Sequence, residues 1–376
     1  MIKNFPRPIA DETFNSWVFR CAHHKSCSTI TDDDLFEIPS PWRLEYDKDA
    51  PDFDFNCEFS IASKIMEATS LSDGALEQLF GRGRRFSLSS TFANAFCPEC
   101  LVEDVKSRGM PSWRKSWCYV DVAYCLKHKR LLCGIDAKLD ESKAWMAYAL
   151  KNPIESASDD GSIENPAKFQ LGGGAIRNHL GMKAQRWISG LYSKDFVKVK
   201  GSDHSISGRE AARCARALMS LFLKKKTYHY GAGIARWYFC NSRHEWDGRH
   251  LSFMEALFAG LRESTPFQRM VALIFTAWVL GVYSEGEIKA FVRFCRTQGY
   301  CWPTSIDELA KEAFSLSTHT EYMQYVELFT KGSAPESAIS FVDDFMSAMH
   351  KNVINISLTP TAYPDEWFKS VRKSIR

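Results

Sequence analysis

The sequence of 376 residues lacks an apolar run long enough to cross a membrane. Its longest nearly apolar stretch, Met270 to Tyr283, is shorter than the roughly 18 residues that a spanning helix requires. We interpret this stretch as a buried core helix. The first twelve residues hold four charged side chains and no apolar segment of signal-peptide length, so we expect a cytoplasmic protein without membrane contact.

A large charge excess of either sign is also missing. The 48 Lys and Arg residues nearly balance 45 Asp and Glu residues, which leaves a formal net charge of +3. A protein that bound nucleic acid over its whole surface would show a stronger basic excess, so we expect any DNA or RNA contact to be local. With 45% hydrophobic residues, the chain has the composition of a folded protein, and its length predicts two or three packed units.

Signatures of catalysis are absent as well. No phosphate-binding loop of the G-x-x-x-x-G-K-[ST] type occurs, because the glycines at 172–174 are followed by Ala175 and Ile176. The run Asp32 to Asp34 offers carboxylates for Mg²⁺, but consecutive acids point in different directions, and we favour a loop or helix cap there. We therefore expect no enzyme and assign no catalytic residue.

Cysteine, by contrast, is plentiful, with twelve in the chain. In a reducing compartment the spacing of cysteines points to metal binding before disulfides. Cys97 and Cys100 form one ligand pair, and Cys125 with His128 forms a second pair after 24 intervening residues. Three thiolates and one imidazole complete a tetrahedral shell, so we predict one structural Zn²⁺ per chain without an open coordination position.

Two further cysteines, Cys118 and Cys133, flank the second ligand pair without a partner at two-residue spacing. Unpaired cysteines most often pack as small buried side chains. We assign both to packing.

The N-terminal segment has the pattern of an amphipathic helix behind a cap at Asp11. The apolar residues that share one face are Phe14, Trp17, Val18, Cys21 and Ala22. We expect this face to be core and Arg20, on the same helix, to be a solvated charge.

The chain as a whole is predicted to be mainly α, with helical N-terminal and C-terminal domains and an inserted zinc-ribbon-like knuckle. Proline, glycine, serine and asparagine accumulate after Lys151 and indicate a linker or long loop. The predicted divisions are 1–95 (helical), 96–150 (zinc-binding), 151–182 (linker or loop) and 183–376 (helical). Helical periodicity in the last division covers 208–223, 252–263, 268–282, 285–296, 306–314, 318–329 and 337–350.

Two of these helices, 306–314 and 318–329, are separated by three residues, a spacing compatible with a helix-turn-helix. The second helix carries Glu321 and Glu327 but almost no cationic residue. We therefore favour ordinary packing over base reading for this pair.

Basic residues concentrate in three places. Each cluster is either a solvated surface or a contact site for nucleic acid or an acidic partner. Aromatic residues accompany the second and third clusters, a combination that suits phosphates and unpaired bases. The candidate contact residues are Arg82, Arg84 and Arg85 in the first cluster, Lys224, Lys225 and Lys226 in the second, and Arg243 and Arg249 in the third, which begins at Arg236.

Several of these segments together resemble the TniQ/TnsD family of transposition target-selection proteins. The matching residues are Phe5-Pro6-Arg7-Pro8, Ser16-Trp17-Val18-Phe19-Arg20, Cys97-Pro98-Glu99-Cys100-Leu101, Trp113-Arg114-Lys115-Ser116-Trp117 and Cys125-Leu126-Lys127-His128. Many relatives carry a further cysteine pair, whereas Cys133-Gly134 is followed here by no C-x-x-C. A second zinc site is therefore expected to be lost or replaced by packing.

The resemblance implies an adaptor that joins a site-recognising element to an AAA+ ATPase regulator, which in turn recruits the transposase. In one branch of the family the selector binds attachment-site DNA directly. In another, shorter members form homodimers on an RNA-guided Cascade complex, with DNA and guide RNA nearby. Moderate length and near-neutral charge favour the second branch. A self-sufficient DNA-binding regulator and a metal-dependent nuclease remain alternatives.

Overall fold

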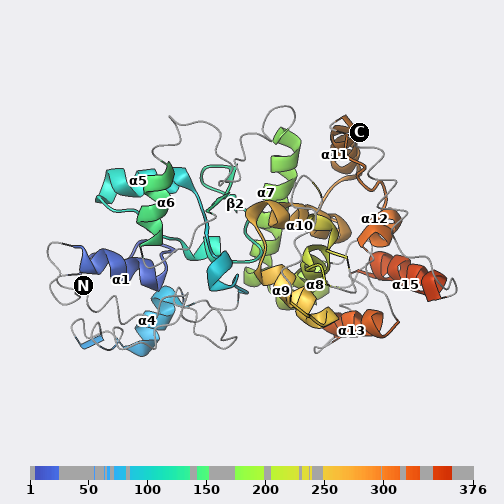
Figure 1. Cartoon of the computed structure of the whole chain (residues 1–376), viewed down its shortest axis with the longest axis horizontal. Helices are drawn as coiled ribbons and strands as arrows, with labels where there is room; N and C mark the ends of the chain where they lie inside the picture. The colour runs from blue at the N-terminus through green and yellow to red at the C-terminus, as the bar shows by residue number, and fades with distance from the viewer. Residues whose placement is uncertain are drawn as a thin grey trace. The chain divides into compact units, whose positions relative to one another are not determined.

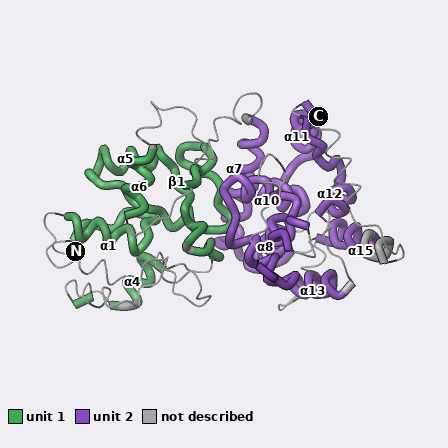
Figure 2. The backbone as a smooth tube through the Cα atoms, viewed as in Figure 1, with its two compact units in different colours: residues 1–168 green, residues 169–376 purple. Residues whose placement is uncertain are grey.

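A computed structural model of the chain divides it into two compact units, residues 1–168 and 169–376 (Figure 2). Helices dominate both units, which confirms the mainly α prediction (Figure 1). No helix in the described part of the chain is long and apolar enough to span a membrane. The structure describes residues 5–24, 55, 63, 66–67, 72–81, 85–135, 142–151, 174–198, 205–227, 231–236, 238, 249–297, 299–313, 319–330 and 342–357.

The first unit combines four described helices with short antiparallel pairs. The helices are α1 (Phe14–Ala22), α4 (Asp73–Phe80), α5 (Pro98–Arg108) and α6 (Lys143–Lys151), with 3-10 turns η2 (Ser90–Phe92) and η3 (Lys115–Cys118). Strand β1 (Ala95–Phe96) pairs with β4 (Cys133–Gly134), and β2 (Tyr124–Cys125) pairs with β3 (Arg130–Leu131). The pairing of β1 with β4 brings the two ends of the 95–134 segment together. The predicted ligands lie within this segment, next to the short strands.

Helix α1 buries the predicted apolar face. Trp17 is fully buried and stacks on Phe80 of α4, with the ring centroids 5.0 Å apart. The cap is Thr13, whose side chain accepts from the Ser16 backbone N–H, so the predicted cap at Asp11 is wrong. Asp11 instead takes a left-handed conformation at φ 68°, and its carboxylate accepts from the Ser116 N–H.

The expectation of a solvated Arg20 is also wrong. Arg20 is 5% exposed, and its guanidinium donates to both carboxylate oxygens of Glu12 at 2.7 and 2.8 Å. Glu12 is 1% exposed and also accepts from the hydroxyl of Ser16. A buried arginine requires such a partner, and the acid eight residues away provides it because the chain turns back at the start of α1.

The second unit is built around α8 (Gly208–Leu223) and α10 (Pro266–Val279), which pack against each other. Both begin at capping boxes, Ser207 with Glu210 and Thr265 with Gln268, which satisfy the free N–H groups of the first turn. The remaining elements are α7 (Gly174–Gly190), η5 (Leu191–Ser193), β5 (Phe196–Lys198), β6 (Ser205–Ser207), η6 (Ile234–Arg236), α9 (Phe253–Arg262), α11 (Glu285–Thr297), α12 (Ile306–Ala313), α13 (His319–Thr330) and α15 (Asp343–Ser357).

The long apolar stretch from Met270 is confirmed as a buried core helix, since α10 is buried from Pro266 to Ala277. The predicted helix 208–223 coincides with α8, and the other predicted helices of this region recur with shifted ends. Helix α7, in contrast, already begins at Gly174, inside the segment 151–182 that was predicted as linker or loop. Buried Leu180, Ala184 and Ile188 recur there at helical spacing, and this periodicity prevails over the preceding glycines.

Helices α12 and α13 occupy the segments considered for a helix-turn-helix. Helix α12 packs against α15, and α13 packs against α8, α9 and α15. The exposed side of α13 presents Met323, Gln324 and Glu327, with no cation among these described positions. This packing agrees with the interpretation favoured from the sequence, and a helix-turn-helix role for the pair has no structural support.

Candidate metal centre

Two local structures position the four predicted ligands. Cys97 is the N-cap of α5, and Pro98 is its first residue, where the missing N–H of proline costs no hydrogen bond. Cys100 therefore falls in the first turn of the helix. Cys125 ends β2, and His128 lies in the turn that leads to β3. Lys129 allows this tight turn by adopting φ 52°. A helix start and a hairpin turn thus face each other with two ligands each.

The ligand atoms form one compact cluster, within 4.8 Å of one another. The Cys100 and Cys125 sulfurs are 3.7 Å apart, and His128 Nδ1 lies 3.3, 3.3 and 3.5 Å from the sulfurs of Cys97, Cys100 and Cys125. Tetrahedral Zn²⁺ with Zn–S near ~2.3 Å and Zn–N near ~2.0 Å requires separations of roughly 3.8 and 3.5 Å. The observed separations match this geometry, so the cluster could hold one metal ion of that size.

Hydrogen bonds among the three thiols shift their pKa values in opposite directions. A hydrogen bond from Cys100 lowers the pKa of Cys125, and the same bond raises the pKa of Cys100 to about 12. Hydrogen bonds to Cys100 and Cys125 also raise the pKa of Cys97. A bound dication supplies the positive charge that all three thiolates need, so metal binding at this cluster releases protons.

Glu103 on α5 orients the histidine. His128 Nε2 lies 3.0 Å from Glu103 Oε1, which leaves Nδ1 facing the sulfurs. Lys127 also donates to Glu103 and holds the carboxylate in place. A carboxylate behind a ligating imidazole fixes the ring orientation and raises its basicity.

Substitution Glu103→Gln should therefore weaken the metal site without removing a ligand. We expect zinc affinity to fall about 10- to 100-fold, the usual cost of losing such a partner. Competition with a chromophoric chelator measures this change. Glu77→Gln, which removes an exposed acid on α4, is the matched control, and equal affinities for the two variants would contradict the orienting role.

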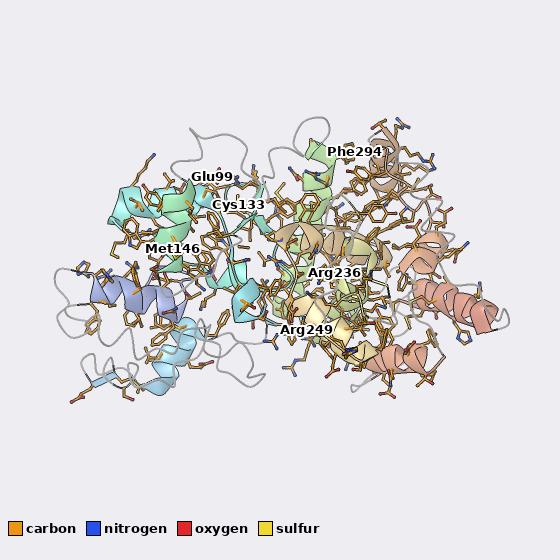
Figure 3. All side chains as sticks on the ribbon, in the orientation of Figure 1. Glu99, Cys133, Met146, Arg236, Arg249 and Phe294 are labelled. Carbon is orange, nitrogen blue, oxygen red and sulfur yellow. The ribbon has the colours of Figure 1, made fainter. Side chains whose placement is uncertain are left out.

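Arg130 on β3 contacts both Glu99 and Cys133, two residues that Figure 3 labels. Its guanidinium pairs with Glu99 and donates to the Cys133 sulfur at 3.6 Å. Cys133 is fully buried in β4, and Cys118 is 1% exposed, so both are packed side chains as predicted. Among the described residues, Cys97, Cys100, Cys125 and His128 are the one group of side chains placed to hold a metal ion.

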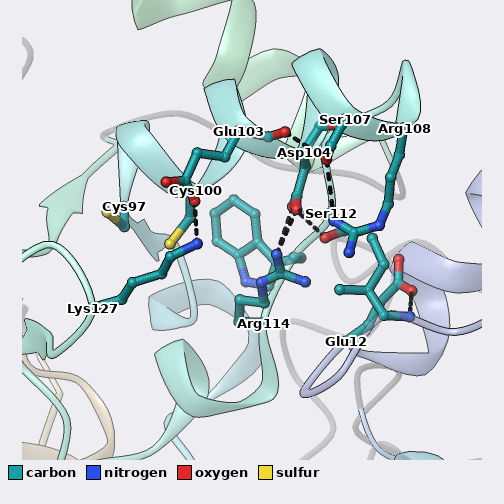
Figure 4. Close-up of polar contacts among 12 residues, drawn as sticks. Glu12, Cys97, Cys100, Glu103, Asp104, Ser107, Arg108, Ser112, Arg114 and Lys127 are labelled. Carbon is teal, nitrogen blue, oxygen red and sulfur yellow. Dashed lines mark hydrogen bonds and ion pairs between the residues drawn. The ribbon is translucent and has the colours of Figure 1, made fainter.

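A buried acid, Asp104, connects α5 to the segment that follows it (Figure 4). Both its oxygens accept from Arg114, at 2.7 and 2.8 Å, and it also accepts from the hydroxyl of Ser112 at 2.6 Å. The next residue, Trp113, donates its backbone N–H to Ser16 on α1 at 2.8 Å. The N-terminal motif and the ligand-bearing helix are therefore held together by charged and backbone hydrogen bonds.

Residues 4–132 match the TniQ family model. The match spans the N-terminal motif, Asp104 and all four cluster residues, and it supports a TniQ domain in this part of the chain. TniQ is a transposition adaptor or regulator family, and the match implies a transposition-related role in target selection. No curated protein and no solved structure matches the chain significantly.

The first basic cluster precedes the predicted metal ligands in the sequence. Of its three candidate arginines, the structure describes Arg85. It pairs with Asp121 at 2.6 Å, and its guanidinium lies 4.1 Å from the centre of the Tyr119 ring. Arg82 and Arg84 lie outside the described residues, as do Arg243 and the run Asp32 to Asp34. A contact of the Arg82 to Arg85 segment with phosphate stays a prediction.

The second basic cluster, beyond the TniQ region, is largely internal. Lys224 is fully buried, with its ammonium 5.6 Å from the centre of the Phe253 ring, and Lys225 is 5% exposed. Neither ammonium is at the surface of this structure, and a contact of these two lysines with phosphate stays a prediction. The cluster follows α8 directly, where the chain passes under α9. Lys226, the third member, is half-buried.

Glu263, at the end of α9, is the acidic partner of two of the predicted contact residues, Lys225 and Arg249. Its carboxylate pairs with Lys225 at 3.1 Å and accepts from Arg249 at 3.0 Å. Arg236 is also buried in this unit (Figure 3), where it donates to the carbonyl oxygens of Leu223 and Gly260. These cations stabilise the fold, and no sequence pattern separated them from surface charges.

Burial lowers the pKa of Lys224 to about 7, although Glu321 opposes the shift. Unfolded lysine titrates near ~10.4, so above pH 7 the unfolded state binds more protons and folding stability rises with pH. We expect Lys224→Met to remove up to about 1 kcal/mol per pH unit of this rise between pH 7 and 9. Urea unfolding at several pH values measures it, and parallel curves for the two proteins would show that Lys224 does not titrate there.

Sequence reasoning missed Glu103, Asp104 and Glu12. A signal existed for Glu103, because an acid three residues after Cys100 lies on the same face of a helix as that ligand. No comparable signal existed for Asp104 and Glu12, whose partners come from other segments.

Proposed function

We propose that this chain is a target-selection adaptor in DNA transposition that bridges an RNA-guided Cascade complex to an AAA+ ATPase regulator. In this role it acts in the cytoplasm as a homodimer and performs no chemistry on DNA or ATP. The metal cluster is proposed to hold one Zn²⁺ that stabilises the docking unit. The regulator then recruits the transposase to the site that the guide RNA has selected.

The observation that supports this proposal is the TniQ match over residues 4–132, which includes the cluster of four ligand-type side chains. Three sulfurs and one imidazole occupy every position of a tetrahedral ion, so a metal held there has no place for a reactive water. A closed metal site of this kind stabilises a fold and does not favour a nuclease. The charges support the RNA-guided branch, because Arg85, Lys225 and Arg249 each pair with an acid of the same chain.

Affinity purification from cells that carry the complete transposition operon tests the bridge. The tagged chain should recover the subunits of the RNA-guided complex, the AAA+ regulator and guide RNA, which sequencing of the eluted RNA identifies. Guide RNA should disappear from the eluate when the complex is deleted.

Two outcomes would contradict the proposal. Recovery of the regulator with attachment-site DNA and no guide RNA would favour direct DNA selection. Tight, salt-sensitive binding of one duplex sequence by the purified chain would favour a self-sufficient regulator.

A further inference from the structure

The most exposed large apolar side chain recorded in the described residues is Phe196, at 73%. It lies on β5, which forms an antiparallel hairpin with β6 between α7 and α8. A ring exposed to this extent is available to stack against a ligand. Neither the TniQ match nor the predicted basic clusters include this hairpin.

Alternation along the two strands separates a buried face from an outer face. Val197 and Ile206 face each other across the pair and are 8% and 2% exposed. Side chains two residues apart share a face, so Phe196 and Lys198 point outward together. Ser205 lies opposite Lys198 in the register and is also exposed. The outer face of the hairpin, defined by Phe196, Lys198 and Ser205, thus combines an aromatic ring, a cation and a hydroxyl.

A further cation lies beside this outer face. Lys194 precedes β5 and is exposed, with its ammonium 6.0 Å from the centre of the Trp187 ring on α7. Of the neighbouring acids, Glu210 accepts from the Ser207 N–H and hydroxyl in the α8 cap, and Asp195 is exposed between Lys194 and Phe196. Among the described residues of this segment, two exposed lysines, Lys194 and Lys198, outnumber one exposed acid, so the surface has a local positive charge.

We propose that the outer face of the hairpin binds single-stranded nucleic acid, with an unpaired base stacked on Phe196 and phosphates held by Lys194 and Lys198. Lysines contact the backbone of any nucleic acid, whereas an isolated exposed ring gains little from a duplex, whose bases are already stacked. Residues two apart on a strand are about 6.6 Å apart, which places a cation beside the stacked base. This binding does not depend on the bridging role.

Fluorescence anisotropy of the full zinc-loaded chain with labelled oligo(dT), oligo(U) and a duplex of equal length tests the proposal. Phe196→Ala should weaken binding of the single strands roughly tenfold without changing the salt dependence. Phe196→Trp, which keeps a ring, should restore the affinity. Lys198→Gln should lower the slope of log affinity against log salt by about 0.7, the contribution of one phosphate contact on a single strand.

Two control variants separate this face from general surface effects. Phe258→Ala removes a ring that is 42% exposed on α9, and Lys289→Gln removes an exposed lysine on α11; neither should change binding. Stronger binding of oligo(U) than of oligo(dT) would identify RNA as the ligand, and the reverse would identify DNA. Unchanged affinity of Phe196→Ala, preference for the duplex, or no binding by the parent chain would each overturn the proposal.

Discussion

Serine in place of Cys100 is expected to remove the metal and unfold the 85–135 segment. Binding of a structural zinc ion contributes about 10–16 kcal/mol in small zinc domains, whereas the net stability of a domain is only about 5–15 kcal/mol. The strands around the cluster are two residues long and cannot replace this contribution. Elemental analysis should give one Zn²⁺ per parent chain and almost none for the variant. In thermal unfolding, the variant should lose the cooperative transition of the 85–135 segment.

Cys118→Ala is the matched control, because Cys118 is buried in the same unit but is no part of the cluster. It should keep one metal ion per chain. A Cys100→Ser protein that retains a full metal ion would contradict the four-ligand site. A content near zero or near two in the parent chain would contradict the single site.

The second large effect is expected at the buried Glu12–Arg20 pair. Arg20→Met leaves the carboxylate of Glu12 buried without its cation, at a cost of about 3–5 kcal/mol in the free energy of unfolding. Urea unfolding followed by tryptophan fluorescence is a suitable measurement, because Trp17 is fully buried on the same helix. The same substitution should loosen the contact between α1 and the segment at Trp113, where Thr13 and Ser16 bond to its backbone.

A double variant, Glu12→Gln with Arg20→Met, distinguishes a buried charge from lost packing. Without the carboxylate charge, much of the lost stability should return, because a neutral amide costs less to bury than an unpaired acid. Equal stability of the single and double variants would show that packing of the arginine stem, and not its charge, accounts for the loss.

The four-residue cluster could be predicted from the sequence because metal binding requires short local spacings between ligands. C-x-x-C and C-x-x-H each place two ligands within one turn, whatever the rest of the fold does. Helix α8 was predicted with its observed ends for a similar reason, since Ser207 and Glu210 mark its start and its apolar residues recur at helical spacing.

Charged residues were harder to interpret because sequence does not tell whether a cation is buried. Lys224 and Arg20 look like surface charges in the sequence. Lys224 is buried by chain segments far from it, and Arg20 is buried because the turn before α1 brings Glu12 to it. Exposure was equally hidden for Phe196, which the hydrophobic pattern alone would place in a core. Partners at long range decide these cases, and single-sequence periodicity carries no information about them.

Insertion in a reconstituted transposition system tests the adaptor role most directly. The assay compares reactions with and without this chain, and measures target binding by the RNA-guided complex separately from insertion at the guided site. We predict that omission abolishes guided insertion while target binding continues, and that the purified chain neither cleaves DNA nor hydrolyses ATP. Insertion that continues at the guided site without the chain would contradict the bridging mechanism.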